Sequence, residues 1–222
     1  MRRACYFCGP PMDTTKLLIG AVAACAAFAA VKAQGQDLTA TLNGISPGLT
    51  LQGTWNDGGF VYDYPAGVMK FTDEASHTDF STFCVEPLQD IGYGETLVYQ
   101  IQNPISLANS NTIASLVGGY LASSRSDQNA AAVQWAIWEV TTEGLLSASL
   151  FDGSVRIMEP VSEGTALLAN HYLANVANYT PATLTYLRND NRQDVVTWNV
   201  VPEPASAGLV ALSGLVLLRR RR

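Results

Sequence analysis

Residues 126–142 read SDQNAAAVQWAIWEVTT, and this stretch decides the class of fold. Its apolar side chains recur at the spacing of one helical face, and Ser126 followed by Asp127 is a typical helix start. The sequence therefore predicts a helix over Asp127–Thr142. Because strand-like segments lie on both sides of it, we expect helices inserted between the strands of a sheet.

The residues before this helix are typical of short strands separated by turns. Segments rich in β-branched and aromatic residues alternate with Gly, Pro and Asn clusters that mark turns. The expected strands are Asp37–Leu42, Gly48–Leu51, Phe60–Tyr64, Val68–Thr72, Phe80–Val85 and Thr96–Ile101. The expected turns are Asn43-Gly44, Pro47-Gly48, Asn56-Asp57-Gly58-Gly59 and Pro65-Ala66-Gly67.

Helical spacing also predicts helices over Asn111–Ser123 and Glu163–Asn178. Two further strands, Thr183–Arg188 and Asp194–Val200, close the domain. The predicted class is α+β, with a sandwich-like or barrel-like β scaffold and an inserted helical segment. We expect one domain over residues 34–200.

The N-terminal segment is typical of an export signal. An unbroken apolar run from Leu17 to Ala30 follows Lys16, and small residues precede a cleavage site after Ala33. The sequence thus predicts a signal peptide over residues 1–33, starting at Met1 or at Met12. The apolar run is too short for a full membrane span of about 20 residues.

The C-terminal segment, residues 201–222, has three parts in order. Val201-Pro202-Glu203-Pro204 precedes an apolar run to Leu218, and the sequence finishes with an arginine cluster. Fourteen helical residues reach roughly 21 Å, less than a hydrocarbon core of about 30 Å. Arginines stay on the cytoplasmic side, so the segment predicts a transient stop in the inner membrane or a simple tail anchor. The cluster is Arg219, Arg220, Arg221 and Arg222.

This tail resembles the PEP-CTERM sorting signal of Gram-negative bacteria. The resemblance covers residues 201–222 and rests on Pro202, Glu203 and Pro204, the short apolar run and the arginines. It implies processing by the membrane enzyme exosortase. It also implies export to the cell surface, the outer membrane or the extracellular matrix of a biofilm, often alongside exopolysaccharide.

The charge of the predicted domain excludes some partners. Residues 34–204 hold 5 Lys and Arg against 18 Asp and Glu, a formal net charge of −13. Nucleic acid needs a basic surface, and so does an electrostatic contact with anionic lipid. We therefore expect no nucleic-acid partner. Lys70 is the single lysine of residues 34–204, so this domain has few amines of its own that could attack an acyl bond.

Removal of the signal peptide leaves one cysteine, Cys84, because Cys5, Cys8 and Cys25 all precede the cleavage site. A lone thiol in an exported protein cannot form an internal disulfide and is open to oxidation. Gln134 lies in the middle of the predicted helix. Its carboxamide can react with a thiol to give a thioester and ammonia, so the two residues suggest a side-chain cross-link.

The residues around this pair suit a protected acyl bond. Trp138 lies one helical turn after Gln134 on the same face, and Trp135 is adjacent, so both indoles can exclude water. Phe83 or Cys84 points inward from the strand, depending on register. The carboxylates of Glu86 and Glu139 are candidate acid–base partners. The cross-link would stabilise the fold by roughly 4 kcal/mol.

Both segments resemble the signatures of bacterial thioester domains, the Cys-Gln modules of surface adhesins. Phe83-Cys84-Val85-Glu86 matches the cysteine motif. The run from Gln134 to Trp138 matches the glutamine motif, with Val133 where the family usually has threonine. The resemblance covers most of Trp55–Val140.

The resemblance implies a cross-link between Cys84 and Gln134 that serves covalent attachment. A partner amine or hydroxyl, on an exopolysaccharide or a protein, would attack the acyl carbon and release the thiol. The product is an amide or an ester, and the bond is used once, so the protein is not expected to be an enzyme. No cofactor and no metal is expected.

Two other functions remain open from the sequence. The first is a non-covalent structural protein of the biofilm matrix, in which Cys84 is an inert small hydrophobe. The second is a secreted cysteine hydrolase, with His171 as base and Asn170 or Asn175 orienting it. Strand tyrosines fit either a sugar-binding face or a packed core. They are Tyr62, Tyr64, Tyr93 and Tyr99.

Overall fold

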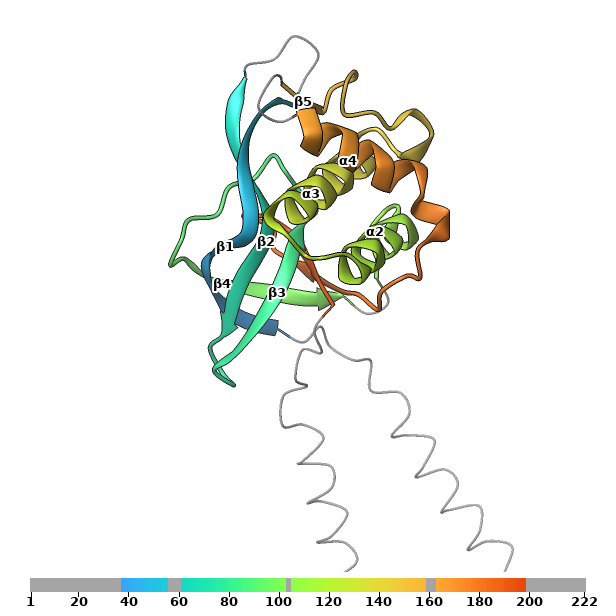
Figure 1. The fold of residues 1–222 in the computed structure, drawn as a ribbon. Helices are drawn as coiled ribbons and strands as arrows, with labels where there is room; N and C mark the ends of the chain where they lie inside the picture. The colour runs from blue at the N-terminus through green and yellow to red at the C-terminus, as the bar shows by residue number, and fades with distance from the viewer. Residues whose placement is uncertain (1–36, 56–60, 103–104, 159–162, 199–222) are drawn as a thin grey trace, which may run out of the picture. The chain divides into compact units, whose positions relative to one another are not determined.

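The computed structural model of the chain describes residues 37–55, 61–102, 105–158 and 163–198. Within them, six antiparallel strands close into a barrel in the order β1, β2, β3, β7, β6, β4 and back to β1 (Figure 1). The strands are β1 (Asp37–Thr54), β2 (Tyr62–Asp73), β3 (Thr78–Cys84), β4 (Thr96–Gln102), β6 (Thr185–Arg188) and β7 (Val195–Thr197). A two-residue strand, β5 (Arg156–Ile157), pairs with the end of β1. The predicted α+β class and β scaffold are confirmed.

The helices occupy the chain between β4 and β6. They are α2 (Ser110–Ala122), α3 (Asp127–Thr142) and α4 (Glu163–Ala174), with short 3-10 turns at Leu145–Ser147 and Val176–Asn178. The three helices lie together on one side of the barrel (Figure 1). Helix α3 packs against β1, β2 and β3 as well as against the two other helices. It is therefore the element that links the helical layer to the barrel.

Helix α3 has the bounds that the sequence predicted. Its first turn is capped by Ser126, whose hydroxyl accepts a hydrogen bond of 3.2 Å from the backbone N–H of Asn129. The helix expected over Glu163–Asn178 is shorter, because α4 ends at Ala174 and a 3-10 turn follows. Strands β6 and β7 are also shorter than predicted.

Three of the predicted turns were wrong. Asn43-Gly44 and Pro47-Gly48 lie inside β1, and Pro65-Ala66-Gly67 lies inside β2. Their glycines and prolines mark irregularities in the β1–β2 register, where the strands bend without ending. At the closest approach Gly67 faces Gly48, and a Cβ on Gly67 would lie 2.4 Å from the carbonyl oxygen of Pro47. The turn predicted at residues 56–59 lies outside the described residues.

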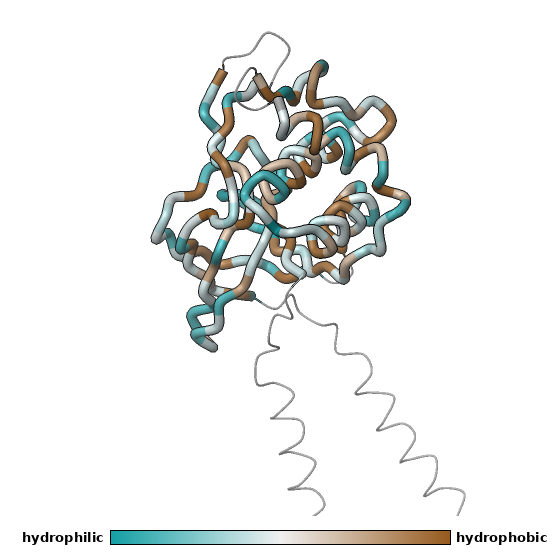
Figure 2. Tube along the Cα trace, in the orientation of Figure 1, coloured by the Kyte–Doolittle hydropathy of each residue, from teal (hydrophilic) through white to brown (hydrophobic). Residues whose placement is uncertain are grey.

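The core has two parts that share the barrel wall. Inside the barrel, Phe71 stacks on Phe80 and meets Tyr99 edge-on. On the other face of β3, Phe83 contacts the ring of Tyr120 from α2 and the ring of Trp198. Polar residues gather instead at the hairpin between β2 and β3, as Figure 2 shows. Strand β3 is thus covered on both faces near its end.

The predicted signal peptide (1–33) and sorting tail (201–222), including its proline, glutamate and arginine residues, lie outside the described residues. Among the residues that are described, no helix is long and apolar enough to cross a membrane.

Candidate functional site

Cys84 is the last residue of β3 and is 2% exposed. Side chains alternate along a strand, so Cys84 shares the barrel-interior face with Thr82 and Phe80. Phe83 takes the opposite face, against α2. This settles the register that the sequence left open. Within the described residues Cys84 is a free cysteine.

Gln134 reaches Cys84 from the middle of α3 and binds its backbone twice. The N–H of Cys84 donates to Oε1 of Gln134 at 2.9 Å, and Nε2 of Gln134 donates to the carbonyl oxygen of Cys84 at 2.8 Å. The amide is 1% exposed. The structure therefore brings the predicted pair into contact, through the side chain of one residue and the main chain of the other.

This contact stands where a neighbouring strand would otherwise pair. The last described pair between β2 and β3 is Met69 opposite Thr82, two residues before Cys84. On the other side of β3, pairing with β7 continues to Cys84 opposite Val195. Because a side-chain amide carries both N–H donors and an acceptor oxygen, Gln134 completes the ladder at this position. The amide carbon is thus held beside the residue that carries the thiol.

A pocket of about 300 Å³ adjoins the pair. Tyr93 is 65% exposed and Asp90 is exposed, so the pocket reaches the surface through the loop after β3. Asp90 is the charged residue of the described lining, which is otherwise mostly apolar. The described lining residues are Leu42, Ile45, Tyr64, Pro65, Gly67, Met69, Cys84, Pro87, Asp90, Ile91, Gly92, Tyr93, Gln134, Trp138 and Gln193.

Burial raises the pKa of the Cys84 thiol to about 12, and the charges of Glu86 and Asp194 act in the same direction. The indole of Trp138 and the backbone of Glu86 oppose this by favouring negative charge on the sulfur. Burial outweighs them. The thiol is therefore neutral at pH 7 and keeps its proton until a reaction removes it.

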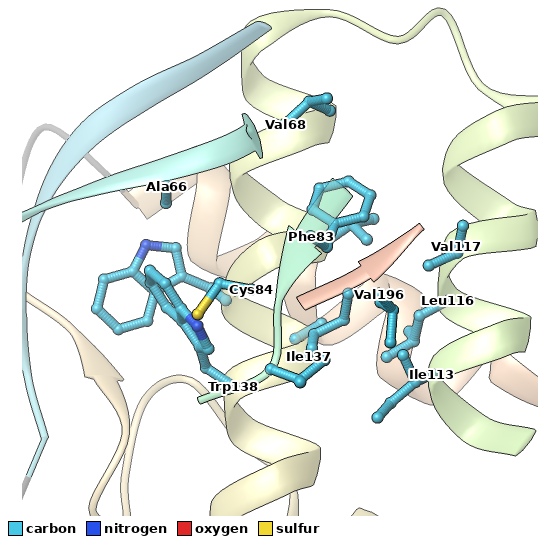
Figure 3. Close-up of a cluster of buried hydrophobic side chains, with 14 of the residues drawn as sticks. Ala66, Val68, Phe83, Cys84, Ile113, Leu116, Val117, Ile137, Trp138 and Val196 are labelled. Atoms are coloured by element: carbon cyan, nitrogen blue, oxygen red, sulfur yellow. The ribbon is translucent and has the colours of Figure 1, made fainter. Parts of the chain in front are cut away.

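Trp138 lies beside this thiol, as Figure 3 shows. Its ring belongs to an aromatic cluster with Trp55, Tyr64 and Trp135, whose ring centroids lie 5.2–6.2 Å apart. Of the two predicted indoles, Trp138 lines the pocket, while Trp135 packs behind it against Gly53. The expected apolar shield is present on one side of the pair.

Glu139 is not among the described residues that line the pocket. It is fully buried, and its Oε1 accepts a hydrogen bond of 2.8 Å from the backbone N–H of Ser149. Its Oε2 has no hydrogen-bond partner in the described structure. Burial raises its pKa to about 7, and the charges of Glu143 and Asp152 add to the rise. The carboxyl of Glu139 therefore binds the loop after α3.

The other predicted residues are distributed around the site. Glu86 follows the thiol closely, and its carboxylate accepts a 2.9 Å hydrogen bond from Gln89. Tyr64 and Tyr93 line the pocket, whereas Tyr99 is buried in the barrel. Asp90 and Gln193 were missed, because nothing in their local sequence distinguishes them from ordinary loop residues.

The hydrolase reading has little geometric support. His171 is exposed on α4, with its Nδ1 3.3 Å from the side-chain nitrogen of Asn175. Asn170 accepts a hydrogen bond from the backbone of Leu150. His171 and His77 are both absent from the described lining of the pocket that holds Cys84. The described residues also contain no group of three or more His, Cys, Asp or Glu arranged to hold a metal ion.

In comparisons with known proteins, no family model, no curated protein and no solved structure matches this chain.

Proposed function

We propose that Cys84 and Gln134 form an internal thioester, through which this exported protein attaches covalently to an amine or a hydroxyl on a partner. The observation that carries the proposal is the double hydrogen bond between the Gln134 amide and the backbone of Cys84. It holds the carboxamide against the backbone of the residue that carries the thiol, in a buried site. Such positioning lowers the entropic part of a reaction barrier.

The chemistry balances without a cofactor. The sulfur of Cys84 attacks the amide carbon of Gln134, the carbon–nitrogen bond breaks, and the thiol proton leaves with the nitrogen as ammonia. Charge that develops on the amide oxygen is stabilised by the N–H of Cys84, which already donates to it. Because the thiolate is the nucleophile, the thiol proton has to move from the sulfur to the departing nitrogen as the sulfur attacks.

In the attachment step the sulfur of Cys84 is the leaving group, whereas it is the nucleophile when the thioester forms. A nucleophile enters through the pocket and attacks the acyl carbon, the carbon–sulfur bond breaks, and the proton of the nucleophile passes to the sulfur. The pocket of about 300 Å³ is large enough for the end of a side chain or a sugar substituent. Burial of both Cys84 and Gln134 slows competing attack by water.

Two observations favour a second function, a non-covalent structural protein of the matrix. Burial raises the pKa of the Cys84 thiol, and both ends of the Gln134 amide are already hydrogen-bonded. In that case the amide of Gln134 only replaces the hydrogen bonds of a neighbouring strand, and Cys84 is an inert part of the core.

Intact mass and thiol titration of the purified signal-processed protein, which lacks Cys5, Cys8 and Cys25, separate the two. The thioester predicts a mass lower by one ammonia and no titratable thiol until methylamine opens the bond. Cys84→Ala and Gln134→Ala should each keep the full mass. The matched control is Gln193→Ala, which changes a glutamine of the same pocket and should retain the loss. A full-mass wild-type protein with a titratable thiol would overturn the proposal.

We also propose export to the cell surface or matrix and processing by exosortase. Export is supported by the predicted signal peptide of residues 1–33, and processing by the sequence motif of residues 201–222. Mass spectrometry of the C-terminus of the exported protein tests it, with cleavage near Pro202-Glu203-Pro204 as the expected result.

A further inference from the structure

Trp138 buries an indole N–H that has no ordinary partner. The residue is 4% exposed, and its Nε1 makes no hydrogen bond of standard geometry within the described structure. A buried N–H without an acceptor lowers the stability of the folded state. Its retention next to a reactive pair calls for a physical reason.

The position of the Trp138 indole N–H suggests a function for it. Trp138 lies four residues after Gln134, so both side chains project from the same face of α3, and both line the pocket with Cys84. Figure 3 shows the thiol of Cys84 directed at the indole ring of Trp138. The sulfur is therefore a candidate acceptor for the N–H, and it accepts more strongly as it gains negative charge.

A second donor comes from the chain itself. The backbone of Glu86, two residues after the thiol, also favours negative charge on the sulfur and lowers its pKa, as the indole does. The two candidate donors for the sulfur therefore come from α3 and from the segment after β3. Neither group is basic, so both can stabilise charge without removing a proton.

We propose that the indole N–H of Trp138, together with the backbone N–H of Glu86, forms a donor site for the sulfur of Cys84 and speeds opening of the thioester. The proposal rests on the function proposed above and adds a catalytic residue to it. When a nucleophile attacks the acyl carbon, the electrons of the carbon–sulfur bond pass to the sulfur. Trp138 donates to that sulfur and keeps its own proton, and the thiol proton comes from the nucleophile.

Trp135 provides a matched control in the same helix. Its indole Nε1 is likewise buried and unpartnered among the described residues. It does not belong to the described pocket lining, and its ring lies against Gly53, where an added Cβ would come within 2.1 Å of it. Loss of either indole N–H removes a similar group from the same aromatic cluster, but only Trp138 faces the sulfur.

The first experiment measures opening of the thioester by methylamine, followed as the appearance of free thiol. Trp138→Phe should slow opening by about tenfold, the effect of one lost hydrogen bond to a charged atom. Trp135→Phe should leave the rate within about twofold. Equal rates for Trp138→Phe and wild type, or equal slowing by both variants, would overturn the proposal. Absence of the mass loss in the wild type would refute the thioester itself.

The second experiment does not require a thioester. In a Gln134→Ala protein the sulfur remains a thiol, and the indole N–H resonance of Trp138 is recorded by NMR with and without Cys84→Ala. Loss of the sulfur should shift the Trp138 resonance clearly more than that of Trp135. Equal shifts for the two indoles would contradict a donor role for Trp138, whatever the fate of the thioester and even if Trp138→Phe fails to fold.

Discussion

Helix α3 carries two buried polar side chains, Gln134 and Glu139, and the surrounding backbone offers them different hydrogen-bond partners. Gln134 is 1% exposed, and both ends of its amide are paired with Cys84. Glu139 is 0% exposed, and one carboxyl oxygen is bonded to Ser149 while the other is unpartnered in the described structure. The amide and the carboxyl have nearly the same shape, so the difference lies in the donors and acceptors around them.

Position 134 carries an amide because of the backbone groups that it faces. The backbone of Cys84 presents one N–H and one C=O, which only a group with both an acceptor and a donor can satisfy. At Glu139 the backbone presents a donor alone, and a carboxyl is tolerated with a pKa raised to about 7 by burial. The first site is fixed at every ordinary pH, whereas the second changes with protonation.

The largest expected effect comes from giving the Gln134 site a carboxyl. In Gln134→Glu, an ionised oxygen would face the carbonyl oxygen of Cys84, which now accepts at 2.8 Å from Nε2. We expect the free energy of unfolding at pH 8 to fall by about 3 kcal/mol or more. Burial against a carbonyl oxygen raises the pKa of the new carboxyl, and the protonated form restores a donor, so the loss should shrink toward pH 5. Urea unfolding at both values measures it.

That measurement needs a background without a cross-link. Cys84→Ala supplies it, because the hydrogen bonds to Gln134 come from the backbone of residue 84 and survive the change. Gln193→Glu in the same background is the control, since Gln193 is half-buried in the pocket lining. If Gln134→Glu lowers the free energy of unfolding equally at pH 5 and pH 8, the charge of the new carboxyl does not cause the loss, and the explanation given for Gln134 is wrong.

A smaller effect comes from the reverse exchange, Glu139→Gln. A native carboxyl pKa of about 7, above the ordinary value of 4.5, means that the folded state binds more protons between these values. Stability should therefore be full below about pH 4.5 and fall as pH rises through 7. Glu139→Gln should remove this fall and raise the free energy of unfolding at pH 8 by on the order of 2 kcal/mol. At pH 4 it should change little.

Glu139→Ala distinguishes the charge from the hydrogen bond. It removes both, and it leaves the buried N–H of Ser149 without its acceptor. Its stability should be lower than that of Glu139→Gln at every pH. If Glu139→Gln and wild type show the same slope between pH 4.5 and pH 8, Glu139 does not titrate as its surroundings require.

The sequence predicted α3 well because its signals are local. A capping serine and the spacing of apolar residues act within a few residues of each other, and they gave the bounds Asp127–Thr142. The turns at Asn43-Gly44 and Pro65-Ala66-Gly67 were wrong for the opposite reason. Glycine and proline indicate a local bend, but whether the chain reverses there depends on a distant strand continuing beside it.

The site was predicted in the same uneven way. The two motifs put Cys84 and Gln134 together, and the four-residue spacing correctly put Trp138 beside them. Glu139 comes five residues after Gln134, and because each residue turns a helix by about 100°, its side chain projects from a different face of α3. The backbone pairing of Gln134 was beyond the sequence, because it depends on where β2 and β3 stop pairing.

The smallest effect lies at the exposed start of the same helix. Ser126→Ala removes the hydroxyl that accepts from the N–H of Asn129 at 3.2 Å and should lower the free energy of unfolding by about 1 kcal/mol. Ser124→Ala, which removes only an acceptor for the side chain of Asn129, should cost less. Neither change touches a buried group. Both variants should therefore keep the wild-type slope of stability against pH and any mass loss; a changed slope in Ser126→Ala would mean that general weakening of α3, not Glu139, produces the pH dependence.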